Sequence, residues 1–156
     1  MRNNEKGVTL IALVITIIIM AILAITTITT GDLIGKAKFQ SIASNMLLIQ
    51  AKVRIINERF SFNEDPSIYV GKKLKDQTDK SIIANGALTS TELDNENLYV
   101  YDRDTLDSIG LEGINLPNDT IYIVNYENCD IIWPSGVENE NGEKLYKLSE
   151  ILEEIE

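Results

Sequence analysis

The sequence contains no histidine and a single cysteine, Cys129. The absence of histidine removes the commonest general base and metal ligand, and a single cysteine excludes an internal disulfide. Basic residues are also few, since 14 Lys and Arg face 24 Asp and Glu for a net charge of -10. This balance lacks the clustered cations that hold nucleic-acid phosphates, so direct nucleic-acid binding is not expected.

An apolar run near the N-terminus is the longest feature of the sequence. Val8 to Ile28 holds 21 residues, 13 of them Val, Ile or Leu, and no charge occurs between Lys6 and Asp32. A helix of about 20 such residues crosses the hydrocarbon core of a bilayer. The run predicts a membrane-spanning helix over 8–31, followed in a chain of 156 residues by one modest domain.

Two other interpretations fit this run less well. A buried core helix rarely stays apolar around its whole circumference for this length. A cleaved secretory signal has an apolar core of about 7 to 15 residues and a small-residue cleavage site, whereas this longer run ends in ITTITTGDLIG. Arg2 and Lys6 precede the run and Lys36 and Lys38 follow it, so basic residues only slightly favour a cytoplasmic N-terminus with the domain outside the cell.

The junction between the charged N-terminus and the apolar run reads KGVTLI at residues 6–11. This order of residues directly before an unbroken aliphatic helix resembles the N-terminus of type IV pilin-like proteins, which include pseudopilins of type II secretion systems and DNA-uptake machines. In that family a membrane-embedded prepilin peptidase cuts after the glycine and methylates the new N-terminal residue. The resemblance implies cleavage between Gly7 and Val8, a leader peptide of residues 1–7 and N-methylation of Val8.

The resemblance also implies the steps after processing. The subunit waits in the cell membrane, and an assembly platform protein then joins it to other pilin or pseudopilin subunits in a surface filament. The assembly motif at the start of the helix is Thr9, Leu10, Ile11 and Ala12. No cofactor is implied.

Two residues depart from the usual family pattern, which has phenylalanine in place of Val8 and glutamate in place of Ala12. That glutamate pairs with the freed amine of a neighbouring subunit, because a carboxylate in lipid needs a positive partner. Family members that lack it include subunits at filament tips, and Gram-positive pilin-like sequences that read TLIALVITII lack it as well. Ala12 is therefore compatible with a minor or tip subunit and with a Gram-positive lineage.

Beyond the membrane segment, residues 32–60 continue the helix as an amphipathic segment. Apolar residues recur there at steps of three or four, which places them on one helix face. They are Phe39, Ile42, Met46, Ile49, Val53, Ile56 and Phe60. This inner stripe predicts packing on a sheet formed later in the chain, with a free coiled coil as the alternative.

Residues 61–156 predict an α+β globular head. Segments rich in β-branched and aromatic residues predict strands. They are LYVY at 98–101, TIYIVNY at 120–126, CDIIW at 129–133 and KLYKL at 144–148. The fold class is therefore α+β, with one long N-terminal helix packed on a small antiparallel sheet of three or four strands, as in pilin-like proteins.

Turn and helix signals connect these strands. Glu127-Asn128 predicts a two-residue hairpin turn, and Asn141-Gly142 predicts another turn. Residues 103–113 predict a short helix ended by Gly110 or Gly113. Two further predictions are an extended piece around 68–70 and a C-terminal helical turn capped by Ser149.

Charge divides between the two parts of the chain outside the apolar run. Residues 32–75 carry 8 basic and 4 acidic side chains, net +4, and residues 76–156 carry 4 basic and 19 acidic, net -15. The division fits a solvated surface, and it also fits basic helix flanks set against acidic heads in a stack of subunits. Weak calcium candidates in the acidic part, without EF-hand spacing, are Asp94, Glu96, Asp102 and Asp104.

No catalytic constellation accompanies these features, so no enzyme activity is expected. Cys129 has no histidine to activate it and is predicted to be a small core residue in a strand. The sequence therefore predicts a structural subunit of a type IV pilus-like or pseudopilus filament. The alternative is a single-pass, membrane-anchored extracellular binding domain that does not polymerise, for which the junction at Gly7 would have no use.

Overall fold

A computed structural model describes residues 4–114 and 121–155, and the side chains of residues 4–11, 21–34 and 66 lie outside that description. The chain forms two compact units, Met1–Lys38 and Phe39–Glu156.

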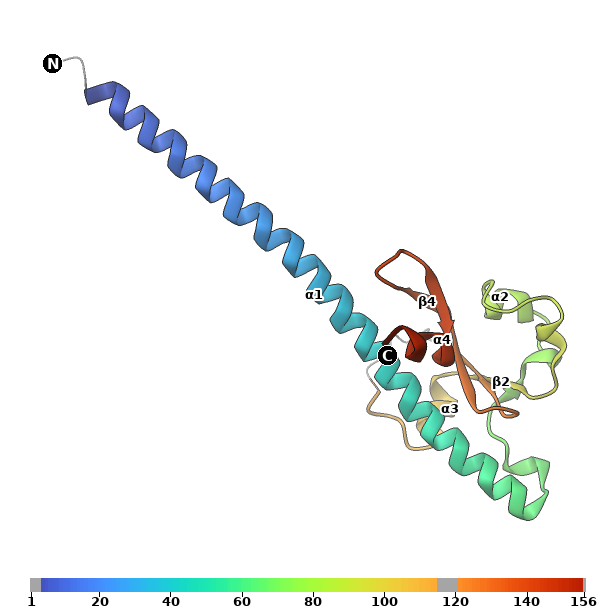
Figure 1. Cartoon of the computed structure of the whole chain (residues 1–156). Helices are drawn as coiled ribbons and strands as arrows, with labels where there is room; N and C mark the ends of the chain where they lie inside the picture. The colour runs from blue at the N-terminus through green and yellow to red at the C-terminus, as the bar shows by residue number, and fades with distance from the viewer. Residues whose placement is uncertain (1–3, 115–120, 156) are drawn as a thin grey trace. The chain divides into compact units, whose positions relative to one another are not determined.

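Helix α1 (Asn4–Asn63) runs through the first unit and into the second (Figure 1). Its extent confirms the prediction of one continuous helix over 8–60. The division of the chain into a leader, a membrane segment, an amphipathic segment and a head stays a prediction.

The second unit contains an antiparallel sheet of five strands in the order of the sequence. The strands are β1 (Lys72–Lys73), β2 (Leu98–Tyr101), β3 (Tyr122–Asn125), β4 (Asp130–Glu138) and β5 (Lys144–Lys147). The α+β class and the antiparallel sheet are confirmed. The predicted number of three or four strands is too low, because β1 has only 2 residues and no periodic signal.

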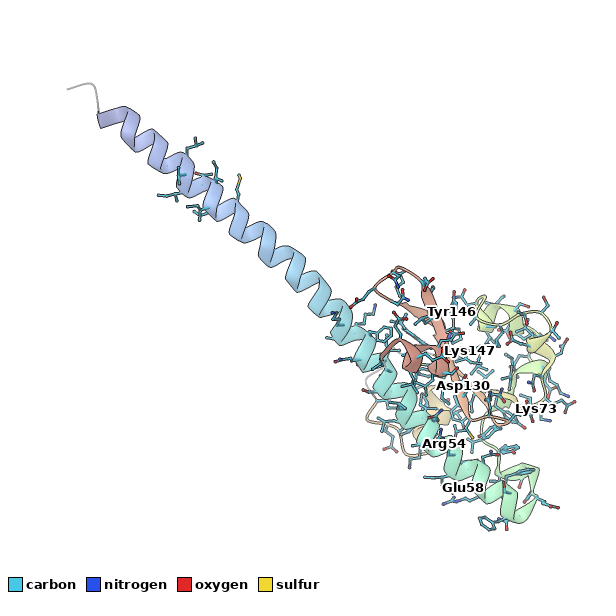
Figure 2. The ribbon with its side chains drawn as sticks, viewed as in Figure 1. Arg54, Glu58, Lys73, Asp130, Tyr146 and Lys147 are labelled. Atoms are coloured by element: carbon cyan, nitrogen blue, oxygen red, sulfur yellow. The ribbon has the colours of Figure 1, made fainter. Side chains whose placement is uncertain are left out.

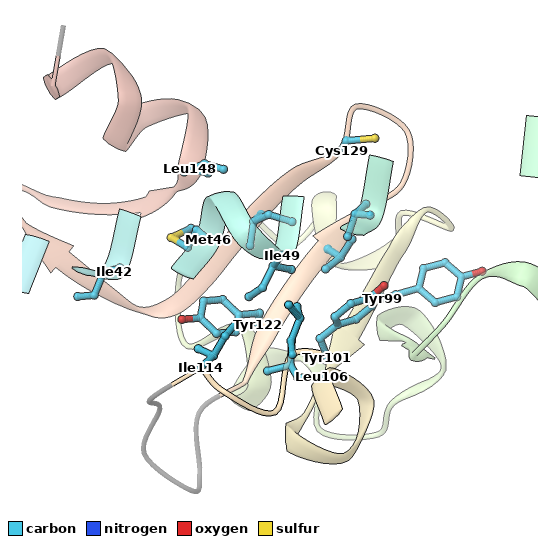
Figure 3. Packing of buried hydrophobic residues seen from close by; sticks show 14 of the residues in the cluster. Ile42, Met46, Ile49, Tyr99, Tyr101, Leu106, Ile114, Tyr122, Cys129 and Leu148 are labelled. Carbon is cyan, nitrogen blue, oxygen red and sulfur yellow. The ribbon is translucent and has the colours of Figure 1, made fainter. Parts of the chain in front are cut away.

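Both faces of the sheet are covered, and strand side chains alternate between two buried clusters. The cluster on the α1 face includes Met46, Ile49, Val53, Tyr99, Tyr101, Tyr122 and Ile131 (Figure 3). The opposite cluster contains Leu74, Ala84, Leu93, Leu98, Val100, Ile123 and Ile132. Since Met46, Ile49 and Val53 are 0% exposed, the predicted inner stripe of α1 is confirmed as the face that packs on the sheet.

Short elements between β1 and β2 supply the cover of the second face. They are η2 (Leu74–Asp76), α2 (Lys80–Ala84) and η3 (Glu92–Asp94). The short helix η1 (Pro66–Ile68), which precedes β1, instead packs Ile68 against the cluster on the α1 face. Figure 1 shows α2 on the side of the sheet away from α1. The predicted extended piece around 68–70 is wrong, because η1 occupies Ile68 and the strand forms later, at Lys72–Lys73.

A tyrosine network ties the segment after α1 to the core. The hydroxyls of Tyr101 and Tyr126 lie 2.6 Å apart, and the Tyr126 oxygen accepts the Val70 N–H at 3.1 Å. Burial raises the pKa of both tyrosines. Tyr69 stacks on Tyr126 with ring centroids 4.1 Å apart. These tyrosines therefore pack as part of the cluster on the α1 face.

The β3–β4 turn differs from the predicted two-residue hairpin. Asn125 pairs with Asp130, so four residues, Tyr126–Cys129, form the connection. Cys129 is buried but lies in this turn at φ 58°, rather than in a strand as predicted. The Gln50 side-chain amide donates to the Cys129 carbonyl at 3.0 Å, which joins the turn to α1. The Asn141-Gly142 turn is confirmed between β4 and β5, with Gly142 at φ 77°.

Two further helices follow strands, and carboxylates organise their ends. Asp102 caps α3 (Arg103–Ser108) by accepting the Thr105 N–H at 2.9 Å. Helix α4 (Leu148–Ile155) begins before Ser149, so the predicted Ser149 cap is wrong. Instead Asp130 of β4 accepts the Ser149 N–H at 3.2 Å and its hydroxyl at 2.7 Å.

Glu150 links α4 to the edge strand β5. Its carboxylate accepts the N–H groups of Tyr146 at 3.1 Å and Lys147 at 3.2 Å. These backbone donors of the outermost strand are therefore satisfied within the chain.

Candidate functional site: the exposed faces of helix α1

The residues predicted for processing and assembly lie in the first turns of α1. Their backbone is helical, and the side chains of the first five lie outside the described residues: Gly7, Val8, Thr9, Leu10 and Ile11. Ala12 is described and exposed. The roles of these residues in cleavage, methylation and assembly stay predictions.

Among the side chains that the structure describes, no helix is both long and apolar enough to cross a membrane. The predicted span over 8–31 falls largely on residues outside that description and stays a prediction.

Residues 12–20 form a helical segment whose large apolar side chains are all exposed. Their exposed fractions run from 47% at Val14 to 66% at Met20. Nine successive helical positions cover the whole circumference, so no single face of the helix hides them. Since burying one side chain of this kind is worth roughly 1.5–3 kcal/mol, the segment requires an apolar surrounding. The one hydroxyl among these residues, on Thr16, donates to the Ala12 carbonyl at 2.8 Å and is thereby satisfied.

A second stripe lies on α1 within the head unit, on the face opposite the inner stripe. We call it the outer stripe, and it consists of Ser41, Ser44, Leu48, Ala51, Ile55, Glu58 and Phe62. Its members recur at alternating steps of three and four, the spacing of a helix–helix seam. All are exposed, Leu48 at 52% and Phe62 at 88%. The stripe begins with two small polar residues and is mainly apolar from Leu48 onward.

Sequence reasoning missed the outer stripe because two serines, an alanine and one acid dilute its hydrophobicity. The available signal was the alternating spacing, which places the small residues Ser44 and Ala51 in line with Leu48 and Ile55. Small side chains in such a seam allow a neighbouring helix to approach closely. With both stripes in view, α1 has an inner face held by its own head and an outer face open to another surface.

Basic side chains border the outer stripe. Arg54 and Arg59 are exposed and form no ion pair with any residue that the structure describes. Figure 2 labels Arg54 and Glu58 along α1. From Leu48 to Phe62 the stripe therefore presents a mainly apolar seam with cationic flanks, which an apolar surface bordered by carboxylates would complement.

Ion pairs connect the short elements of the head with one another and with the sheet. Lys75 pairs with Glu96, Lys80 pairs with Asp94, and Lys147 pairs with Glu92 at 3.1 Å. The pKa of Glu92 is lowered by the backbone N–H of the threonine three residues earlier, then by that threonine's hydroxyl and by Lys147. The pKa of Glu96 is lowered mainly by its hydrogen bond from Lys75.

These contacts involve three of the four carboxylates considered as calcium ligands. Asp94 and Glu96 pair with lysines, Asp102 caps α3, and Asp104 is exposed in the first turn of that helix. Within residues 4–114 and 121–155, no group of three or more acidic or cysteine side chains is placed to hold a metal ion. Three of the four carboxylates therefore have structural partners within the head.

Comparisons with known proteins match a short segment at the N-terminus of the chain. Residues 2–28 match the prokaryotic N-terminal methylation motif, the site of prepilin-type cleavage and methylation. The motif indicates a membrane-inserted, surface-exposed prepilin that a prepilin peptidase processes, and the fold is pilin-like. Together they suggest a type IV pilin or pseudopilin; pilin-like proteins are typically non-enzymatic structural proteins. Searches of curated proteins and of solved structures found no match.

Proposed function

We propose that the protein is a structural subunit of a type IV pilus-like or pseudopilus filament. In this proposal prepilin peptidase cuts after Gly7 and methylates Val8, and an assembly platform protein joins the processed subunits, with their heads outward. The observation that carries the proposal is the segment 12–20, which is apolar and exposed on every side. Its side chains need lipid around them before assembly and neighbouring helices after it.

The outer stripe supports a second contact along the same helix. Its seam spacing and its exposed Leu48, Ile55 and Phe62 suit packing against a neighbouring subunit. Arg54 and Arg59 at its border suit the acidic heads, since residues 76–156 carry a net charge of -15. Assembly would therefore use both halves of α1.

The position of the subunit within a filament depends on Ala12. In this proposal the freed amine of Val8 finds no glutamate at position 12 of a neighbouring subunit, because that residue is alanine. The same holds for tip subunits that lack the glutamate and for the Gram-positive sequences that the N-terminus resembles. The choice between a major and a minor subunit, and the Gram-positive origin, stay predictions.

Mass analysis of the mature N-terminus tests the proposal. We expect the native protein to begin at methylated Val8 and a Gly7→Ala variant to keep Met1. Gly35→Ala is the matched control, because a Cβ there meets nothing within 4 Å, and it should be processed normally. An intact Met1 in the native protein would contradict the proposal and favour the anchored domain that does not polymerise.

A further inference from the structure

A small cavity opens on the head beside η3, at the ends of β3, β4 and β5. It has a volume of about 110 Å³. Its apolar lining comes from Leu88, Leu98 and Ile132, and its amide lining comes from Asn95, Asn125 and Asn128. None of these residues belongs to α1, so the cavity is separate from the surfaces proposed for assembly.

The three asparagines are held in the same way. Each side-chain oxygen accepts the N–H of the residue two positions later, at 2.8 Å for Asn95 and 2.9 Å for Asn125 and Asn128. These bonds set the orientation of each amide. The three NH₂ groups form no hydrogen bond with any residue that the structure describes, and all three asparagines line the cavity.

Acceptors at the cavity are already engaged. Lys147 pairs with Glu92 at 3.1 Å, and the other Glu92 oxygen accepts the Thr89 N–H at 2.7 Å. Asp130 accepts the N–H and hydroxyl of Ser149. Figure 2 labels Asp130 and Lys147 on this part of the head. The cavity therefore offers mainly donors, above an apolar floor.

This chemistry selects a neutral ligand rich in acceptor oxygens. A cation would face the three NH₂ groups, and an anion would face two carboxylates in a head segment of net charge -15. A peptide segment brings as many N–H donors as acceptors, and its donors would lack partners here. A sugar hydroxyl also carries one hydrogen, but that hydrogen rotates and can turn toward solvent while the oxygen accepts, whereas a peptide N–H is fixed in direction. The C–H face of a sugar ring suits the apolar floor.

We propose that this cavity binds the terminal sugar ring of a neutral glycan. The ring edge would accept hydrogen bonds from the three asparagine amides, and its C–H groups would contact Leu88, Leu98 and Ile132. Liquid water occupies about 30 Å³ per molecule, so the cavity holds the edge of a single ring and the rest of the glycan extends into solvent. Access to glycans outside the cell rests on the proposed function, whereas binding itself does not.

Saturation-transfer NMR on the purified full chain in detergent micelles tests the site. The probes are the methyl glycosides of glucose, galactose, mannose and N-acetylglucosamine, with triglycine as the peptide probe. Asn125→Asp and Asn128→Asp keep the oxygen that holds the turn and remove the donor. We expect each to weaken binding of the preferred glycoside by roughly fivefold. Asn141→Asp makes the same charge change in the β4–β5 turn, outside the cavity, and should bind as the native chain does.

Three results would overturn the proposal: no transfer to any glycoside in the native chain, binding in the two cavity variants as strong as in the native chain, or binding of triglycine in place of the glycosides. The mature N-terminus of the same preparation is analysed by mass. A chain that starts at methylated Val8 and binds no glycoside would overturn the cavity site alone. A chain that keeps Met1 and binds a glycoside would overturn the filament proposal alone.

Discussion

Two neighbouring residues on α1 should respond in opposite ways to truncation. Ile49 belongs to the inner stripe and is 0% exposed, whereas Leu48 belongs to the outer stripe and is 52% exposed. We expect Ile49→Ala to destabilise the head and Leu48→Ala to leave its stability nearly unchanged while weakening assembly.

The magnitudes follow from burial. Removing three carbons from a fully packed Ile49 leaves a cavity between α1 and the sheet, at a cost of about 3 kcal/mol. Leu48→Ala at an exposed position should change the free energy of unfolding by less than about 0.5 kcal/mol. In a filament the exposed half of Leu48 would contribute about 1 kcal/mol per contact, so its loss should lower filament yield roughly fivefold.

Urea unfolding of the full chain in detergent micelles measures the first effect. Trp133 is the only tryptophan and packs at the edge of the α1-facing cluster, so its fluorescence reports on the head. With an m-value of about 1.5 kcal/mol/M, the Ile49→Ala midpoint should fall by about 2 M. Filaments sheared from cells and quantified by blotting measure the second effect.

Equal unfolding midpoints for the two variants would refute the assignment of inner and outer faces. A Leu48→Ala variant with native stability and native filament yield would refute the role of the outer stripe and leave the fold intact.

Other predictions concern the head. Tyr126→Phe should cost about 1–3 kcal/mol in urea unfolding, because it leaves buried hydrogen-bonding groups, among them the Tyr101 hydroxyl, without their partner. Gly71→Ala should lower the thermal midpoint by several degrees, because its Cβ would lie 2.7 Å from a backbone oxygen at φ 94°, whereas Gly113→Ala meets open space. Hydrogen bonds lower the pKa of Glu92 from 4.5, so their stabilisation is complete above pH 4.5 and is lost as the pH falls through the folded-state pKa. Glu92→Gln should flatten that decline in the urea midpoint between pH 6 and pH 3, and an unchanged slope would argue against the contribution of Glu92.

The local sequence pattern correctly predicted the elements in which buried residues recur at regular spacing. The inner stripe of α1, the strands at 98–101 and 144–147 and the helix after Asp102 all carry strong periodic or capping signals, and the structure contains them. These are the places where a single physical requirement, one buried face or one capped end, decides the local conformation.

Elements whose conformation depends on tertiary contacts were harder to predict from the sequence. Strand β4 continues past Pro134 to Glu138, although proline usually ends a strand, because a register shift between Ile132 and Val137 accommodates it. Helix α2 has 5 residues, too few for a periodic signal. The start of α4 is set by Asp130, which lies 19 residues away from Ser149 in the sequence.

The same distinction between local and tertiary signals applies to the candidate site. The processing motif is local and is readable from KGVTLI alone. The outer stripe needs the exposure of each residue around α1, and the glycan cavity needs three asparagines that the fold brings together from separate segments. Sequence reasoning therefore identified the processing motif, but it did not identify the outer stripe or the cavity.

The hydrogen bonds of Glu150 at the edge of β5 matter where head domains are packed closely together. An open strand edge invites another chain to add a strand, and subunits held side by side in a polymer would meet such edges at very high local concentration. By occupying the N–H groups of Tyr146 and Lys147, Glu150 closes this part of the β5 edge. In the proposed filament, head domains could then stand close together without extending one another's sheets, and association would depend on the helix.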